Sequence, residues 1–204
     1  LAQDDDELMK ILFLTSEVVP YSKTGGLADV SHSLPKALAE EGVDVKVFTP
    51  FYKTTKEKFQ NNIGIAETIS GNNFTGRNSS FEILRNNKDE KCPVYFIGND
   101  QYYNREGLYG DVGSDYFDNS LRFAFFAKAV LAYIEKTGDK PDIIHCNDWH
   151  TALVPFYLRT TKNEQRTTTL FTIHNLAYQG LCPFFFMPFI GVSLKYYRPA
   201  LLEF

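Results

Sequence analysis

Residues 10–50 read KILFLTSEVVPYSKTGGLADVSHSLPKALAEEGVDVKVFTP, and this stretch decides the fold. It begins with a short apolar run, Lys10 to Thr15, which is typical of a strand buried on both faces. Apolar residues at three- and four-residue spacing between Leu27 and Glu41 then predict an amphipathic helix, which Gly42 ends. A second apolar run follows, from Val43 to Thr49. A strand, a crossover helix and a second strand predict a parallel strand pair.

The same alternation of strand and helix recurs later in the chain. Residues 118–136 predict a helix that is apolar around most of its circumference, followed by a strand at 142–145. A helix at 149–159 and a strand at 168–173 complete the pattern. We therefore predict an α/β fold with a Rossmann-like, doubly wound and mainly parallel sheet, and with helices on both of its faces.

The segment between residues 51 and 117 is less regular. Short apolar runs at Phe81–Leu84 and Pro93–Ile97 predict hairpin or edge strands. The Tyr- and Gly-rich stretch from Asn99 to Phe117 predicts a long ordered loop, and loops of that length are often functional.

Composition excludes several classes of protein. Of the 204 residues, 44% are hydrophobic and 15% aromatic, which excludes a disordered chain. A net charge of −4 disfavours binding to nucleic acid, and the sequence contains no apolar run of about 18 residues that could span a membrane. Cys92, Cys146 and Cys182 have no metal-ligand spacing, and we expect them to be buried apolar residues in a reducing compartment.

Ligands of doubly wound folds bind beyond the carboxyl ends of the parallel strands. Three polar clusters follow predicted strands here: Lys23 to Asp29, Cys146 to Thr151 and His174 to Gly180. We expect all three clusters to converge at one edge of the sheet.

The first cluster has the composition of an anion site. Gly25 and Gly26 let a ligand approach the backbone closely, and the helix that follows offers free N–H groups and a positive dipole. With the cation of Lys23, these features suit a diphosphate, although a tight turn beside a surface lysine has equal weight. The chain lacks both the Gly-x-Gly-x-x-Gly fingerprint of dinucleotide sites and the Gly-x-x-x-x-Gly-Lys-Ser/Thr phosphate loop.

In the second cluster, we expect Asp148 to cap a helix whose first turn contains His150. The imidazole of His150 would then lie at the rim of the sheet, where it contributes little packing and can bond a sugar hydroxyl or a phosphate. We expect His145, at the end of a strand, to be a core histidine. The spacing of His145 and His150 does not fit a zinc site.

The third cluster leaves an apolar strand at His174 and Asn175 and ends at Gly180. Two polar side chains at a strand end predict a loop-borne ligand site. Tyr178 is equally consistent with a stacking platform and with a core residue.

Four ordered stretches carry a resemblance to a known family: Thr15–Val30, Asp118–Phe123, Asn147–Leu153 and Thr172–Gly180. They resemble bacterial glycogen synthases and plant starch synthases, which are retaining glucosyltransferases of the two-lobed GT-B fold. The resemblance runs from about Lys10 to the end of the chain. It implies that residues 10–204 are the N-terminal catalytic lobe, and we expect residues 1–9 to be a flexible leader or tag remnant.

The resemblance also implies roles for individual residues. His150 matches the histidine beside the transferred glucose, and Asp118 matches a position tied to glucose or acceptor binding; we predict both as catalytic. Lys23 is expected to contact the nucleotide-sugar donor, with Tyr103 as a looser match to a donor-site tyrosine. Together with the cluster residues, the predicted substrate-binding set is Lys23, Gly25, Gly26, Asp29, Tyr103, Asn119, His174 and Asn175, and no residue is predicted to bind a metal.

The implied reaction is transfer of glucose from ADP-glucose or UDP-glucose to the non-reducing end of an α-1,4-glucan, with retention and without a cofactor. Family members continue into a second lobe that supplies most of the nucleotide pocket, so we expect residues 1–204 alone to be inactive. The alternative is a stand-alone sugar- or nucleotide-binding module. The compartment would be the cytoplasm in a bacterium and the plastid in a plant or alga.

Overall fold

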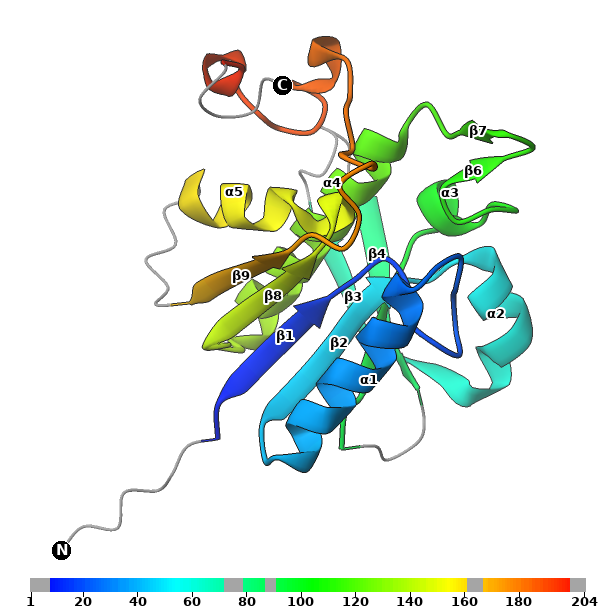
Figure 1. The fold of residues 1–204 in the computed structure, drawn as a ribbon, viewed down its shortest axis with the longest axis vertical. Coiled ribbons are helices and arrows are strands. Elements are labelled where there is room, and N and C mark those ends of the chain that lie inside the picture. The colour runs from blue at the N-terminus through cyan, green and yellow to red at the C-terminus, as the bar shows by residue number, and fades with distance from the viewer. Residues whose placement is uncertain (1–7, 72–78, 87–90, 161–166, 199–204) are drawn as a thin grey trace, which may run out of the picture.

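The computed structural model describes residues 8–71, 79–86, 91–160 and 167–198, so residues 1–7 of the expected leader lie outside the described residues. A seven-stranded sheet with the order β3-β4-β5-β2-β1-β8-β9 runs through the centre of the molecule (Figure 1). Its pairs from β5 through β2, β1 and β8 to β9 are parallel, which confirms the predicted Rossmann-like sheet. The strands are β1 (Lys10–Leu14), β2 (Asp44–Pro50), β3 (Ile63–Gly71), β4 (Ser79–Asn86), β5 (Val94–Gly98), β8 (Ile143–Asn147) and β9 (Thr168–Thr172).

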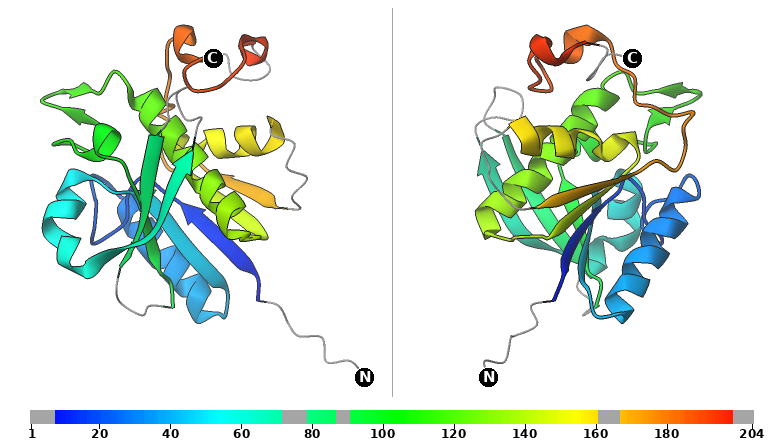
Figure 2. Two further views of the ribbon diagram at one scale, coloured as in Figure 1. Left: turned by 180° about the vertical axis from the view of Figure 1, so that it is seen from behind. Right: turned by 60° about the vertical axis from the view of Figure 1, so that its left-hand side comes forward.

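Helices cover both faces of this sheet, as predicted. Helix α1 packs against one face, and α4 and α5 pack against the other (Figures 1 and 2). The helices are α1 (Leu27–Glu40), α2 (Lys53–Phe59), α3 (Asp100–Tyr103), α4 (Asn119–Thr137) and α5 (Leu153–Thr160), and 3₁₀ turns occur at Gln60–Asn62, Trp149–Thr151, Phe184–Phe186 and Leu194–Tyr196.

The sheet separates two hydrophobic cores, and the alternation of side chains along β1 explains why. Ile11 and Phe13 point into the core beneath α1, whereas Leu12 and Leu14 point into the larger core beneath α4 and α5. A strand with a core on each face must be apolar at every position. This is why residues 10–15 form a continuous apolar run.

Helix α4 is the central element of the larger core. Four consecutive residues, Ala124 to Ala127, are each at most 3% exposed. The helix ends before Gly138, which has a φ of 68° and thus the left-handed conformation that glycine adopts at little cost.

Three parts of the chain differ from their predicted structure. The weakly patterned segment after β2 contains α2 and β3, neither of which was predicted, and the loop at 99–117 contains α3 and a hairpin of β6 (Gly110–Asp111) and β7 (Ser114–Asp115). The helix predicted from residue 149 starts as a 3₁₀ turn and becomes α-helical only at Leu153. The chain enters that turn through Asp148, whose φ of 56° is outside the helical region.

The carboxyl ends of the three strands that precede the polar clusters lie side by side. Leu14 of β1 pairs with Cys146 of β8, and Asn147 of β8 pairs with Thr172 of β9. This register brings the three strand ends to one edge of the sheet, and the second and third clusters begin there, whereas Lys23 follows the end of β1 by nine residues.

Candidate active site

The first cluster forms an open loop at the start of α1. The Nζ atom of Lys23 lies 2.6 and 2.7 Å from the two carboxylate oxygens of Asp29, and both side chains are more than half exposed. No described atom lies within 4 Å of the position that a Cβ atom would take on Gly25 or Gly26. The loop therefore offers open space beside its backbone, and an exposed cation that already has one anionic partner.

The carboxylate of Glu17 anchors this loop through hydrogen bonds, a role that the sequence did not predict. The residue is 3% exposed, and its carboxylate accepts hydrogen bonds from the backbone amides of Thr24 and Gly25 and from the Thr24 hydroxyl. The only signal in the sequence was its place just beyond the first strand. A buried carboxylate requires several donors, which here come from the glycine loop.

Tyr109 connects that carboxylate to the rest of the site. Its hydroxyl donates to Glu17 Oε1 at 2.6 Å and lies 2.7 Å from the hydroxyl oxygen of Ser16. The carbonyl oxygen of Tyr109 accepts a hydrogen bond from Asn119 Nδ2 at 2.7 Å. The predicted residue Asn119 is therefore joined to the glycine loop through Tyr109 and Glu17.

His150 lies in a box of aromatic rings rather than at an exposed rim, so that expectation was wrong. Its ring centroid is 4.1 Å from that of Trp149 and 4.6 Å from those of Tyr109 and Phe123. Burial, together with the guanidinium of Arg122, lowers the pKa of His150 to about 3, so the imidazole is neutral at physiological pH. Its Nδ1 atom is buried and has no hydrogen-bond partner among the described residues.

A buried arginine organises the predicted residues at the start of α4. Arg122 donates to the carbonyls of Tyr102 and Leu108 and to Asn119 Oδ1, at 2.7 to 2.9 Å. Asp118 instead pairs with both terminal nitrogens of Arg105 at 2.7 Å. Burial opposes ionisation of Asp118, but the Arg105 guanidinium outweighs it and lowers the pKa of this carboxyl below its usual value.

Tyr103 lies in the larger core. The side chain is fully buried, and its hydroxyl donates to the carbonyl of Arg122 at 2.9 Å. Among the described contacts, Tyr103 meets other core aromatic rings, including those of Tyr52 and Phe125.

The prediction that Asp148 caps a helix was wrong. Its carboxylate makes no capping bond and instead accepts from the backbone amides of His174, at 2.7 Å, and Asn175, at 3.4 Å. Asp148 thus attaches the third cluster to the second. Nε2 of His174 also lies 2.9 Å from Asn147 Oδ1.

The loop of the third cluster returns over the second cluster. Gly180 lies so close to Trp149 that a Cβ atom would be 2.3 Å from the indole ring, so only glycine fits there.

Tyr178 is 66% exposed and therefore is not a core residue. His145 is a core histidine, as predicted: it is buried, packs against Phe13, and bonds the Thr172 hydroxyl through Nε2 at 2.8 Å.

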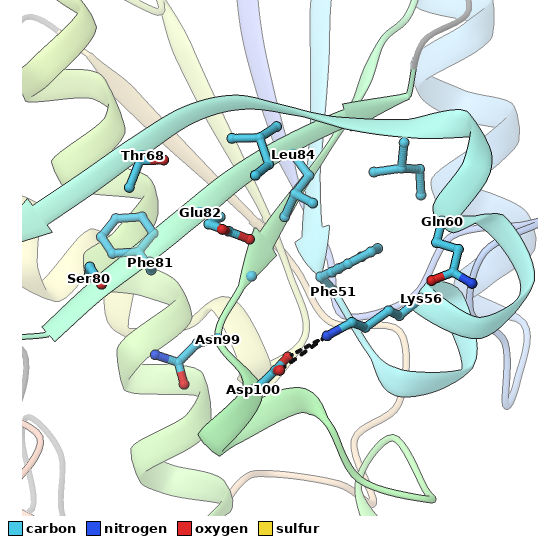
Figure 3. A pocket seen from close by; sticks show the side chains of 13 residues that line it. Phe51, Lys56, Gln60, Thr68, Ser80, Phe81, Glu82, Leu84, Asn99 and Asp100 are labelled. Atoms are coloured by element: carbon cyan, nitrogen blue, oxygen red, sulfur yellow. Dashed lines mark hydrogen bonds and ion pairs between the residues drawn. The ribbon is translucent and has the colours of Figure 1, made fainter.

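A hollow of about 530 Å³ lies beside residues that none of these clusters contains (Figure 3). It is bounded by β3, β4, the end of β5, α2 and the start of α3, and the ion pair between Lys56 and Asp100 lies at its edge. None of the predicted site residues lines it. Within the described ranges, no three His, Cys, Asp or Glu side chains gather closely enough to hold a metal ion, and no helix is long and apolar enough to cross a bilayer.

Comparison with known proteins identifies relatives of this chain. A family model described as the starch synthase catalytic domain matches residues 10–204. The chain is 42% identical over 201 residues to a glycogen synthase of Geotalea daltonii, covering 96% of this chain and 41% of the relative. It is 40% identical over 210 residues to a glycogen synthase of Desulforudis audaxviator, with 98% and 41% covered. It thus spans about two fifths of the length of these relatives.

A solved structure has the same arrangement of elements. The catalytic domain of starch synthase IV from Arabidopsis thaliana, bound to ADP and acarbose, matches with a TM-score of 0.75 and 27% identity. The match covers 95% of this chain and 39% of that one.

Proposed function

The chain belongs to the starch synthase catalytic domain family as its N-terminal domain, and on that premise we propose that it forms the acceptor-side lobe of a retaining glucosyltransferase. The proposed reaction transfers glucose from ADP-glucose to the non-reducing end of an α-1,4-glucan. ADP is favoured over UDP because the related starch synthase IV was solved with ADP bound.

In this proposal, the diphosphate of the donor binds at the loop between β1 and α1. The first amides of a helix have no intrahelical partner and carry the positive end of its dipole, so the start of α1 attracts an anion. Lys23 adds a charge-assisted contact. The diphosphate competes with Asp29 for this lysine, which the exposure of the ion pair allows.

The glucosyl group binds where α4 begins, beside the aromatic box around His150. There Asn119, His174 and Asn175 offer hydrogen-bonding groups to sugar hydroxyls. The neutral imidazole of His150 acts in this scheme as a hydrogen-bonding group and not as a charge. Asp118, whose carboxylate Arg105 holds, lies at the start of the same helix and is proposed to contact the glucose or the acceptor.

One observation carries the proposal: a continuous series of contacts joins the phosphate end to the sugar end. The Thr24 and Gly25 amides bond Glu17, Glu17 bonds Tyr109, and the Tyr109 ring packs on His150. A donor that bridges diphosphate and glucose needs both ends at a constant separation.

The test is binding of ADP to the Lys23→Ala variant. In an NMR titration, ADP is added to the chain up to a concentration in the tens of millimolar. This range is sufficient to measure a Kd as weak as ~1 mM, which corresponds to about −4 kcal/mol. We expect Lys23→Ala to weaken ADP binding about tenfold or more, because a charge-assisted hydrogen bond is lost.

Lys36→Ala is the matched control, since Lys36 is an exposed lysine further along α1. This variant should bind ADP like the wild-type chain. Equal ADP affinity in all three proteins would show that Lys23 is only a surface residue.

A further inference from the structure

Glu17 makes a set of contacts that an ordinary loop carboxylate does not make. It is almost fully buried, and its two oxygens together accept four hydrogen bonds: two from backbone amides, one from the Thr24 hydroxyl and one from the Tyr109 hydroxyl. The first three come from the glycine loop. The fourth comes from a residue 92 positions away.

These bonds decide which amides of the loop remain for a ligand. The N–H groups of Thr24 and Gly25 already point at the Glu17 carboxylate and are occupied by it. The next three amides, Gly26 to Ala28, begin α1 and have no intrahelical acceptor, whereas the Asp29 amide already donates to the Gly26 carbonyl. An incoming phosphate is therefore directed to the helix start, since the carboxylate occupies the earlier amides.

The fourth bond, from the Tyr109 hydroxyl, links the glycine loop to the proposed glucosyl end of the site. Because the Tyr109 proton is donated to Glu17, the Tyr109 oxygen accepts from Ser16, and the hydroxyl is held from two sides. The ring of Tyr109 then forms one wall of the box around His150, with its centroid 4.6 Å from that of the imidazole. A change at Glu17 thus moves a wall of the His150 box as well as the glycine loop.

We propose that Glu17 is the positioning residue of this site, which holds the Lys23–Gly26 loop and the Tyr109 side chain in one arrangement so that the diphosphate and glucosyl ends of the donor fit simultaneously. This inference rests on the proposed function for the identity of the ligand. Glu17 itself touches neither end of the donor and acts through the loop and through Tyr109.

The first arm of the test needs no ligand. Glu17→Gln removes the charge that strengthens the two amide bonds, because they become neutral hydrogen bonds even when the remaining oxygen faces the amides and the NH₂ group faces the two hydroxyls. We expect hydrogen exchange at the Thr24 and Gly25 amides to accelerate at least about tenfold. Glu40→Gln, the same substitution at an exposed position at the end of α1, should leave both rates unchanged. Wild-type exchange rates in Glu17→Gln would overturn the proposal.

The second arm compares ADP with ADP-glucose by NMR titration. Glu17→Gln should weaken both ligands about tenfold or more, because the loop is released. Tyr109→Phe leaves the bonds between Glu17 and the loop in place, so it should leave the affinity for ADP unchanged. It should reduce only the amount by which the affinity for ADP-glucose exceeds that for ADP. A folded Glu17→Gln protein with wild-type affinity for both ligands would overturn the proposal.

The two arms separate this inference from the proposed function. A wild-type chain that binds neither ADP nor ADP-glucose contradicts the proposed function, and the exchange rates at Thr24 and Gly25 then decide the positioning role alone. If Glu17→Gln fails to fold, Tyr109→Phe decides it: reduced preference for ADP-glucose over ADP supports the link, and an unchanged preference overturns it.

Discussion

The imidazole of His150 is enclosed by the rings of Tyr109, Phe123 and Trp149, and this enclosure decides what the residue can do. Taking a charged imidazolium out of water is costly, and the buried Arg122 guanidinium adds repulsion, so the neutral form is favoured. In the unfolded chain the same side chain titrates near pH 6.5. The folded state therefore loses stability relative to the unfolded state as the pH falls below about 6.5.

This difference in pKa makes His150 a source of acid sensitivity. Between about pH 3 and pH 6.5, the imidazole of His150 is protonated in the unfolded chain but neutral in the folded one. Linkage then predicts that its contribution to the free energy of unfolding falls by up to about 3 kcal/mol from pH 7 to pH 4. We expect His150→Asn to be less stable at pH 7 but to lose less stability over this range than the wild-type chain.

Urea unfolding at each pH measures the effect. His32→Asn, at an exposed position on α1, is the control and should follow the wild-type profile. Parallel stability profiles for wild type and His150→Asn would contradict the buried, neutral state of this imidazole.

At the scale of elements, Arg122 determines how the long segment after β5 is held. One guanidinium from α4 bonds the carbonyl of Tyr102 in α3 and the carbonyl of Leu108 in the loop that follows. The guanidinium also lies over the Tyr116 ring, with 4.9 Å between the carbon and the ring centroid. An ordered loop therefore depends on a helix that follows it in the chain.

Replacing Arg122 by methionine should destabilise the protein strongly. Methionine fills much of the same volume but donates no hydrogen bond, so the buried carbonyls of Tyr102 and Leu108 lose their donor. We expect a loss of about 3 kcal/mol or more in the free energy of unfolding, because each buried acceptor without a donor costs about 1–3 kcal/mol. Denaturant unfolding measures the loss.

Arg159→Met, at an exposed position near the end of α5, is the matched control and should change stability by less than about 0.5 kcal/mol. An equally small loss in Arg122→Met would show that the guanidinium does not anchor the loop.

At the scale of the whole molecule, the site is open on the side of the glycine loop. The two cores on either side of the sheet let this domain fold on its own packing. The proposed donor site, in contrast, has described cationic and amide groups on one side of the expected diphosphate only: Lys23 and the start of α1.

We expect the 204-residue chain to fold but not to transfer glucose. Departure of a nucleoside diphosphate needs preorganised positive groups in a site that excludes water, and contacts in an open site are weakened several-fold by solvent. Incubation with labelled ADP-glucose and glycogen should therefore give no sustained incorporation of label into polymer. A full-length glycogen synthase such as that of Geotalea daltonii is the positive control. Repeated turnover by the purified chain would mean that one lobe holds a complete active site.

Local pattern was sufficient for the central elements of the sheet and for the helices that pack on it. Strand β1, helix α1 and strand β2 follow from spacing within residues 10–50, and α4 follows from its run of apolar residues. The glycine loop could be proposed as a site for the same reason, since Lys23, Gly25 and Gly26 are neighbours in sequence. The strand β3 was missed because its pattern is weak and its pairing partner β4 sets its conformation.

The amino-acid sequence by itself determined the central strands and helices, such as β1, α1, β2 and α4, because their patterns depend on residues a few positions apart. Only the tertiary structure decided the partners of the buried polar groups. Glu17 meets Tyr109 across 92 positions, and Asp148 bonds His174 across 26 positions instead of capping a helix. The burial of His150 likewise depends on the rings of Tyr109 and Phe123, which come from two distant segments. A buried polar group takes whichever donor or acceptor the topology brings to it, and no spacing along the chain encodes that encounter.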